Sequence, residues 1–315
     1  MRDRSTVSID QNEYVASILE RWGLGDAAGQ PVPIPHGSDL TPCSDAEHEE
    51  AKHLDYREIV GCLNYACLTV VEIQYAVNAL SRFFHRWGKR PYQLALGVLR
   101  YLKTRPDQRI TYRHGHPQPN ELIGWSDADY AGDKSTMKST GAYYVYMNGG
   151  PIAIKVFTMK TIARSTADAE STALASCATD VLFCREFLRE IGVYDSAGEG
   201  DYDSKDYEPN AYSLVQHPPS LIKCDNEATI KLAKRRTTTD QSKHLCVRQA
   251  FLHQVSEENK YVRYEYVNST KNLADLGTKL LGRIVFERLR NAVYGDHEVV
   301  VEDGGKIPMP DGNGR

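Results

Sequence analysis

The spacing of apolar residues predicts helices in the first third of the chain. Between residues 56 and 103, apolar side chains recur every three or four positions, which is the period of one helical face. The faces so formed are Ile59, Val60, Leu63 and Cys67, then Ile73 to Phe84, then Leu94, Ala95, Val98, Leu99 and Leu102. We therefore expect residues 56–117 to contain a small helical unit.

After Pro117 the period changes to that of strands. Asn148-Gly149-Gly150 is a hairpin turn signal between two apolar stretches. The expected elements are strands at 121–126, 142–147 and 152–157, a helix at 166–191, a strand at 221–224, helices through 234 and over 242–258, a strand at 261–267 and a last helical stretch to about 294. This order predicts an α/β fold, with a mixed five-stranded sheet, the strand at 122–126 in its centre, and helices on its faces.

Composition separates the remaining segments. Residues 1–55 contain one short amphipathic stretch and a proline-rich connector, which is typical of the end of a larger unit. Residues 195–220 are acidic and rich in Gly and Pro, which predicts a surface insertion within a domain at 118–295. Residues 296–315 are expected to be a disordered tail.

The composition is that of a globular protein with its own core. The chain has 315 residues, of which 41% are hydrophobic and 25% are charged. No run of about 18 apolar residues occurs, so we expect no membrane span and no membrane partner. The 7 cysteines form no close pairs, which argues against a disulfide framework or a zinc site. Together with a start that lacks an apolar signal core, this favours an intracellular location, in cytoplasm or nucleus.

Charge is unevenly spread, although the net charge is only −4. Asp107 is the only acid among the basic residues Arg82, Arg86, Lys89, Arg90, Arg100, Lys103, Arg105, Arg109 and Arg113. The segment from Asp195 to Glu208 is acidic instead. Contacts with phosphate groups need a local basic surface, whatever the net charge of the whole chain. A solvated helix face is the alternative interpretation of the basic run.

Four acids occupy positions that call for an explanation. Asp127 and Asp225 each follow an apolar strand directly, and Asp275 lies near the start of the last helix. Glu170 falls in an apolar helical stripe, where burying a bare charge is costly. Each acid also has an ordinary interpretation. Asp127 suits a turn, Glu170 can reach water at the edge of its stripe, and the other two can cap helices.

Taken together, these acids predict a metal site. A strand-end Asp, a helix Glu, a second strand-end Asp and a helix-start Asp can converge at one pole of a mixed sheet. Hard divalent cations prefer clustered carboxylate oxygens. Two such ions about 4 Å apart can activate water and stabilise the leaving oxygen in phosphodiester cleavage. Without a metal the carboxylates would repel one another, which raises the pKa of at least one.

Basic residues after Asp225 are candidates for substrate contacts. Lys231, Lys234, Arg235 and Arg236 end the helix that Asp225 opens. They can hold a phosphate backbone near the acids. Favourable charge at a helix C-terminus is the equally simple alternative.

Several segments follow one another in an order that is typical of one family. They are YREIVGCLNYA, AVNALSRF, VLRYLK, GWSDADYAGDKSTMKSTGAYYVY, STADAESTALA, IKCDNEATIKLAK, SKHLCVRQAFL and YVNSTKNLADLGTKLL. On these segments, residues 57–281 resemble the C-terminal part of copia-type retrotransposon Pol polyproteins. The resemblance implies that residues 1–55 are a remnant of a polymerase region, that 56–117 are thumb- or connection-like helices, and that 118–295 form a ribonuclease H-like domain.

The same resemblance implies a site and an activity. The family's metal ligands are the acids in SDAD, in the Ala-acid-Ala-Glu helix, in CDN and in LAD, which are Asp127, Glu170, Asp225 and Asp275 here. They would hold two Mg²⁺ ions, with Mn²⁺ as an alternative, and cleave the RNA strand of an RNA–DNA hybrid. His244 lies in the family's KH motif, which implies a substrate contact or help in product release, or else a structural hydrogen bond. The remainder of a reverse transcriptase is a further expected partner.

The sequence also departs from the family pattern. ADAES replaces the usual AEAEY, Tyr130 stands where tryptophan is usual, Val70-Val71-Glu72 replaces Arg-Pro-Asp, and Cys246 replaces an acid. An aromatic-X-Asp-Asp palm motif is absent before residue 121, so we expect no polymerase activity from this chain alone. The alternative function is therefore an inactive or domesticated retroelement remnant, which binds nucleic acid or has no function. The sequence leaves the oligomeric state open.

Overall fold

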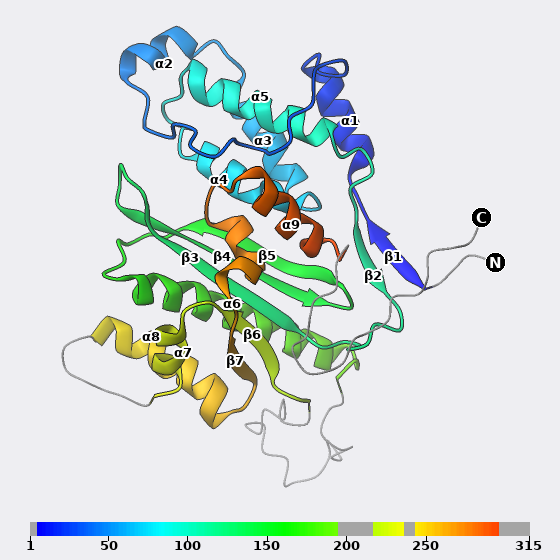
Figure 1. Cartoon of the computed structure of the whole chain (residues 1–315), viewed down its shortest axis with the longest axis vertical. Helices are drawn as coiled ribbons and strands as arrows, with labels where there is room; N and C mark the ends of the chain where they lie inside the picture. The colour runs from blue at the N-terminus through cyan, green and yellow to red at the C-terminus, as the bar shows by residue number, and fades with distance from the viewer. Residues whose placement is uncertain (1–4, 195–216, 236–242, 296–315) are drawn as a thin grey trace.

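The computed structural model describes residues 5–194, 217–235 and 243–295, the last range without the side chains of 243–246. Its centre is a sheet of the order β5-β4-β3-β6-β7 (Figure 1). The strands are β3 (Ile123–Asp133), β4 (Lys138–Met147), β5 (Gly150–Thr158), β6 (Ser220–Cys224) and β7 (Val262–Tyr266). Within the described ranges, no helix is long and apolar enough to cross a membrane.

The sheet is mixed, with β3 at the boundary between its two halves. β3 and β4 are antiparallel, as are β4 and β5. β3 and β6 are parallel, as are β6 and β7. Parallel neighbours need crossover connections, and helices supply them here. The predicted mixed five-stranded sheet with flanking helices and a central 122–126 strand is confirmed.

β3 and β4 are longer than their apolar segments predicted. β3 continues to Asp133 and β4 already begins at Lys138. The expectation that Asp127 follows the end of its strand is therefore wrong, because Asp127 pairs with Ala142 inside the ladder. A register shift between Asp129 and Asp133, with Ala131 at a φ of 53°, marks a bulge in the polar part of β3.

Helices cover both faces of the sheet, as Figure 1 shows. On one face lie α6 (Thr166–Glu190), α7 (Glu227–Ala233) and α8 (Lys243–His253), and a π-helical turn (Gln254–Glu258) continues α8. Alternate residues of β4 point to opposite faces, so Tyr143 and Val145 pack with α6 residues such as Leu174 and Val181. This packing buries the apolar stripe that predicted α6.

The opposite face carries the N-terminal helices and the last helix. They are α1 (Asn12–Arg21), α2 (Asp45–Ala51), α3 (Tyr56–Ala66), a 3₁₀ turn (Val71–Ile73), α4 (Gln74–Ser81), α5 (Lys89–Lys103) and α9 (Arg283–Val293). Their apolar residues share one continuous core with Ala142 and Tyr144 of β4. The helices at 56–103 therefore do not form a core of their own, as a separate unit would. The division of the chain at residue 117 stays a prediction.

A two-stranded ribbon joins the two ends of the helical part. β1 (Thr6–Ile9) pairs antiparallel with β2 (Ile110–Arg113), and the sequence pattern predicted neither strand. The residues after β1 are folded as well, since Val15 and Ile34 lie in the same core as α3 and α5. The predicted tail at 296–315 lies outside the described residues.

The predicted insertion leaves the domain at two points that touch. The rings of Tyr194 and His217 stack with their centroids 3.5 Å apart. Arg185 of α6 lies over Tyr194 and donates to the carbonyl oxygens of His217 and Pro218, at 2.9 Å each. Residues 195–216 lie outside the described residues, so their nature as a surface loop stays a prediction.

Replacing Gly198 to Ser213 with a short Gly/Ser linker should leave the melting temperature nearly unchanged. The two ends are already held together, and halving or doubling a loop changes its closure entropy by only about 0.6 kcal/mol. Circular dichroism melting curves measure this. Arg185→Met is the contrasting variant, because it removes the buried group that joins the two ends, and should lower the melting temperature clearly. A large loss in the linker variant would contradict the prediction.

Candidate metal centre

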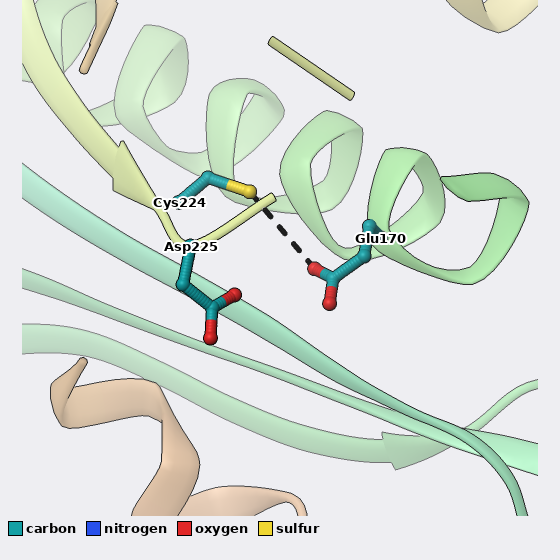
Figure 2. Close-up of side chains that lie close together, drawn as sticks. All are labelled: Glu170, Cys224 and Asp225. Carbon is teal, nitrogen blue, oxygen red and sulfur yellow. Dashed lines mark hydrogen bonds between the residues drawn. The ribbon is translucent and has the colours of Figure 1, made fainter. Parts of the chain in front are cut away.

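The four predicted acids are brought together by neighbouring elements. Ser126 of β3 pairs with Cys224 of β6, so Asp127 and Asp225 come next on adjacent parallel strands. Oxygen atoms of Asp127, Asp225 and Asp275 lie within 4.8 Å of one another. A second group within the same limit joins Glu170, Cys224 Sγ and Asp225 (Figure 2). Asp225 therefore belongs to both groups.

Neighbouring side chains, and not the acids, cap the local helices. Ser165 accepts a hydrogen bond from the Asp168 amide at the start of α6. Asn226 accepts one from the Thr229 amide at 2.9 Å and so caps α7. The capping interpretation of Asp225 therefore does not hold, and its carboxylate lies among the other acids instead.

Asp275 lies in a 3₁₀ turn (Leu273–Gly277), and its predicted position at the start of the last helix is wrong. The reason is local. Asn272 caps this short turn by accepting from the Ala274 amide at 3.2 Å, while α9 begins separately after Gly282. Asp275 is thus not a cap either.

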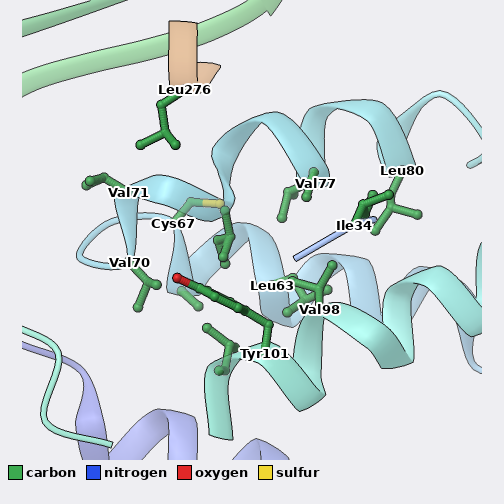
Figure 3. Packing of buried hydrophobic residues seen from close by; sticks show 14 of the residues in the cluster. Ile34, Leu63, Cys67, Val70, Val71, Val77, Leu80, Val98, Tyr101 and Leu276 are labelled. Atoms are coloured by element: carbon green, nitrogen blue, oxygen red, sulfur yellow. The ribbon is translucent and has the colours of Figure 1, made fainter. Parts of the chain in front are cut away.

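This turn is fixed against β3 by polar contacts. Asn272 Nδ2 donates to the Ser126 carbonyl oxygen at 3.0 Å, and the Thr278 hydroxyl donates to the Asp127 carboxylate. From the other side, Leu276 points into the core of the N-terminal helices, which it shares with Val71 (Figure 3). The position of Asp275 therefore depends on both the sheet and the helical part.

Gly277 permits this close approach. A Cβ atom at Gly277 would lie 2.6 Å from Ala142 Cβ and 2.9 Å from Val156 Cγ2. Gly277→Ala should therefore lower the free energy of unfolding by about 1–3 kcal/mol, as overpacking does. Urea denaturation measures it. Gly61→Ala, with open space around it in α3, should instead stabilise by about 0.5–1 kcal/mol. Equal effects of the two variants would show that the contact at Gly277 is not tight.

Burial and mutual repulsion raise the pKa values of Glu170, Asp127 and Asp225. Burial, followed by the charges of Asp127 and Asp225, raises the pKa of Glu170 to about 9. Burial, followed by the charge of Asp275, raises the pKa of Asp127 to about 6. Burial and the charge of Asp127 also raise the pKa of Asp225. Such a cluster is stabilised by any cation that binds among the carboxylates.

One such cation belongs to the chain, and sequence analysis missed it. Lys279 Nζ lies 2.8 Å from Asp275 Oδ1 and 4.0 Å from Asp127 Oδ2. Burial lowers the pKa of Lys279, but the acids outweigh this, and the pKa is raised. The signal was present, because Lys279 follows Asp275 by four residues in the segment LADLGTK.

The donor set suits a hard divalent cation. Asp275 Oδ1 is buried, and its close contact is the Lys279 ammonium at 2.8 Å. Cys224 Sγ donates to Glu170 at 3.9 Å, and burial raises the pKa of this thiol, so sulfur is not the ligand here. Carboxylate oxygens remain, which are the ligands that Mg²⁺ and Mn²⁺ prefer.

The predicted substrate-binding residues are only partly described. Lys231, Lys234 and Arg235 are exposed at the end of α7, and Lys231 pairs with Glu227 at 2.8 Å. The 7 residues of α7 span about 10 Å, which separates these cations from Asp225. Arg236 and the side chain of His244 lie outside the described part. The substrate roles of all five stay predictions.

Comparison with known proteins finds relatives among transposon proteins. The chain is 27% identical over 285 residues to the retrovirus-related Pol polyprotein from transposon RE1 of Arabidopsis thaliana, covering 90% of this chain and 18% of that protein. Against the corresponding protein from transposon TNT 1-94 of Nicotiana tabacum, identity is 26% over 292 residues, covering 90% and 20%. The chain thus spans about a fifth of the length of these relatives. The predicted resemblance to copia-type Pol polyproteins is confirmed.

No protein-family model matches the chain. Among solved structures, LC11-RNase H1, isolated from compost, aligns at a TM-score of 0.33 and 14% identity, covering 51% of this chain and 96% of that one. The N-terminal RNase H domain of a Mycobacterium tuberculosis protein aligns at a TM-score of 0.33 and 11% identity, covering 50% and 95%.

Proposed function

We propose that this chain is a ribonuclease H-type nuclease that cleaves the RNA strand of RNA–DNA hybrids with two Mg²⁺ or Mn²⁺ ions. The observation that supports it most is the convergence of four acids into two groups that share Asp225. The relatives are Pol polyproteins of transposons, which supports a nucleic-acid substrate. A-form hybrids are recognised by shape, and the 2′-hydroxyl marks the RNA strand.

Each residue has a role in this proposal. Asp127, Asp225 and Asp275 would hold one ion, and Asp225 with Glu170 the other. When bound, the ions supply activation of water and charge stabilisation at the leaving oxygen. Thr278 orients the Asp127 carboxylate by donating to it, and Asn272 holds the turn that carries Asp275 against β3.

A cleavage assay tests the function. Purified protein is incubated with a hybrid labelled on the RNA strand, with Mg²⁺, with Mn²⁺ or with a chelator. We expect the RNA strand of the hybrid to be cleaved only when Mg²⁺ or Mn²⁺ is present. Single-stranded RNA and duplex DNA should not be cleaved. Folded protein that cleaves no hybrid with either metal would exclude the proposal.

A second candidate function is a remnant that binds nucleic acid without cutting it. The contact of Lys279 with Asp275 and Asp127 favours it, because a resident ammonium already neutralises part of the acid cluster. This candidate predicts hybrid binding that is indifferent to Mg²⁺. The nuclease proposal predicts that Mg²⁺ binds in spite of Lys279.

A further inference from the structure

A basic cavity lies at the C-terminal end of α9. The opposite end of this helix is the one nearer in sequence to Asp275. It has a volume of about 380 Å³, and its wall is formed by residues 104–109 and by Thr111, Arg113 and Tyr294. Arg105, Arg109 and Arg113 bring three guanidinium groups to one place. They are the end of the basic run that the sequence showed, and nothing in the proposed metal centre uses them.

None of these arginines forms an ion pair with an acid in the described part of the chain, and the acid whose charge Arg105 does feel, Glu72, is fully enclosed behind the cavity wall. Arg105 donates to Gln108 Oε1, and Arg109 Nε donates to the Asp107 backbone oxygen at 3.4 Å. Asp107, the acid that lines the cavity, forms an ion pair with none of the three. Elsewhere arginines do pair with acids, as Arg86 does with Asp45 at 2.7 Å and Arg283 with Glu287 at 2.8 Å. Three like charges that form no ion pair are stabilised when an anionic ligand binds between them.

The walls of the cavity are held by buried contacts. Gln108, which positions Arg105, is 7% exposed. The Tyr294 hydroxyl donates to buried Glu72 and accepts a hydrogen bond from the Val71 amide at 3.0 Å. Thr111 and Arg113 are two residues apart in β2, so their side chains point to the same side of the ribbon. A site fixed in this way is suited to planar, forked donation from arginine to phosphate oxygens.

The length of α9 sets the scale of the separation between the cavity and the carboxylates. α9 has 11 residues, begins at Arg283, four residues after Lys279, and ends at Val293, directly before Tyr294. Its length is therefore about 16 Å. At about 3.4 Å per base pair of B-form duplex this length corresponds to about five base pairs, and an A-form hybrid, which rises less per base pair, needs slightly more. A duplex with one phosphate at the carboxylates has others within reach of the cavity.

We propose that Arg105, Arg109 and Arg113 bind the phosphodiester backbone of a nucleic-acid duplex, about five base pairs from the carboxylates. The register rests on the proposed function, because it assumes that the same duplex reaches the metal centre. Binding at the cavity itself needs neither metal nor cleavage, so it can be measured separately.

The test is the affinity for a labelled RNA–DNA hybrid of about 20 base pairs, roughly two helical turns, in chelator. Fluorescence anisotropy is recorded between about 50 and 200 mM salt. The variant carries Arg105→Gln, Arg109→Gln and Arg113→Gln. The control carries Arg21→Gln, Lys52→Gln and Arg86→Gln, which remove the same charge from exposed, ion-paired positions.

The cavity variant should bind roughly tenfold or more weakly, and its salt slope should be shallower by about 2 to 3, since each phosphate contact contributes about 0.9. The control variant should change the affinity and the salt slope much less. If Arg105→Gln alone lowers the melting temperature, the double variant of exposed Arg109 and Arg113 replaces the triple one, with a slope change of about 2.

Three outcomes decide the inference. Equal losses in the two variants would overturn it, because charge alone would then explain binding. Full competition by inorganic phosphate at the same phosphate concentration would also overturn it, in favour of an isolated phosphate ligand. A loss confined to the cavity variant supports it even if the parent protein cleaves nothing, which separates this inference from the proposed nuclease.

Discussion

Asp127→Asn should abolish cleavage of an RNA–DNA hybrid and leave hybrid binding nearly intact. Asparagine keeps the shape, and its amide oxygen can still accept the Thr278 hydrogen bond. It removes a negative charge and a good metal ligand from the group with Asp225 and Asp275. The rate should fall by roughly a hundredfold to a thousandfold, the scale on which losing a charge-stabilising group slows an enzyme. Affinity comes mainly from basic phosphate contacts and should persist.

Asp129→Asn is the matched control for this experiment. Asp129 lies two residues further along β3 and undergoes the same chemical change, but it belongs to neither group of clustered ligand atoms. We expect it to retain most of the cleavage rate. The two variants are compared in initial rates at saturating Mg²⁺ and in anisotropy titrations with the same hybrid. Parent-like cleavage by Asp127→Asn would exclude the proposed active site.

The length of β3 shows where an apolar pattern stops being informative. Leu122 to Trp125 predicted the strand because buried residues are apolar. The continuation to Asp133 is polar, and it is a strand because β4 pairs with it. Asp129 pairs with Thr140, and after a register shift Asp133 pairs with Lys138. That pairing is long-range information. β1 and β2 are a stronger case, since Ile9 pairs with Ile110 about a hundred residues away and nothing local indicates it.

The acids were predictable as a set, whereas the spacing of Lys279 from Asp275 did not reveal how much that lysine matters. Each acid alone had an ordinary interpretation, and the four became informative through their order along the chain and the family resemblance. Lys279 follows Asp275 by four residues, which is usually an exposed helical pair worth little. Its significance comes from the burial of Asp127 and Asp275, at 3% and 6% exposed. That burial arises from packing the 273–277 turn on β3, which the sequence alone does not reveal.

Magnesium should stabilise the fold, and more strongly near pH 9 than near pH 5. Glu170 and Asp127 have folded-state pKa values of about 9 and about 6, above those of unfolded carboxyls. A raised carboxyl pKa contributes stability that is present below the unfolded pKa and is lost as the pH rises through the folded pKa. Without metal, these groups should therefore lower stability progressively from about pH 4 to about pH 9.

Added Mg²⁺ should reverse this loss, because it binds the ionised carboxylates of the folded chain only. At a concentration of 100 times its Kd the gain is about 2.7 kcal/mol, and the Kd falls as protons leave. Lys279→Met should enlarge the gain near pH 9, since it removes the cation that competes for Asp275 and Asp127. Lys260→Met, at an exposed pair with Glu257, should behave as the parent. Urea denaturation at both pH values, with Mg²⁺ or chelator, measures all three proteins. A gain that is equal at both pH values, or absent, would show that the acids do not form a metal site.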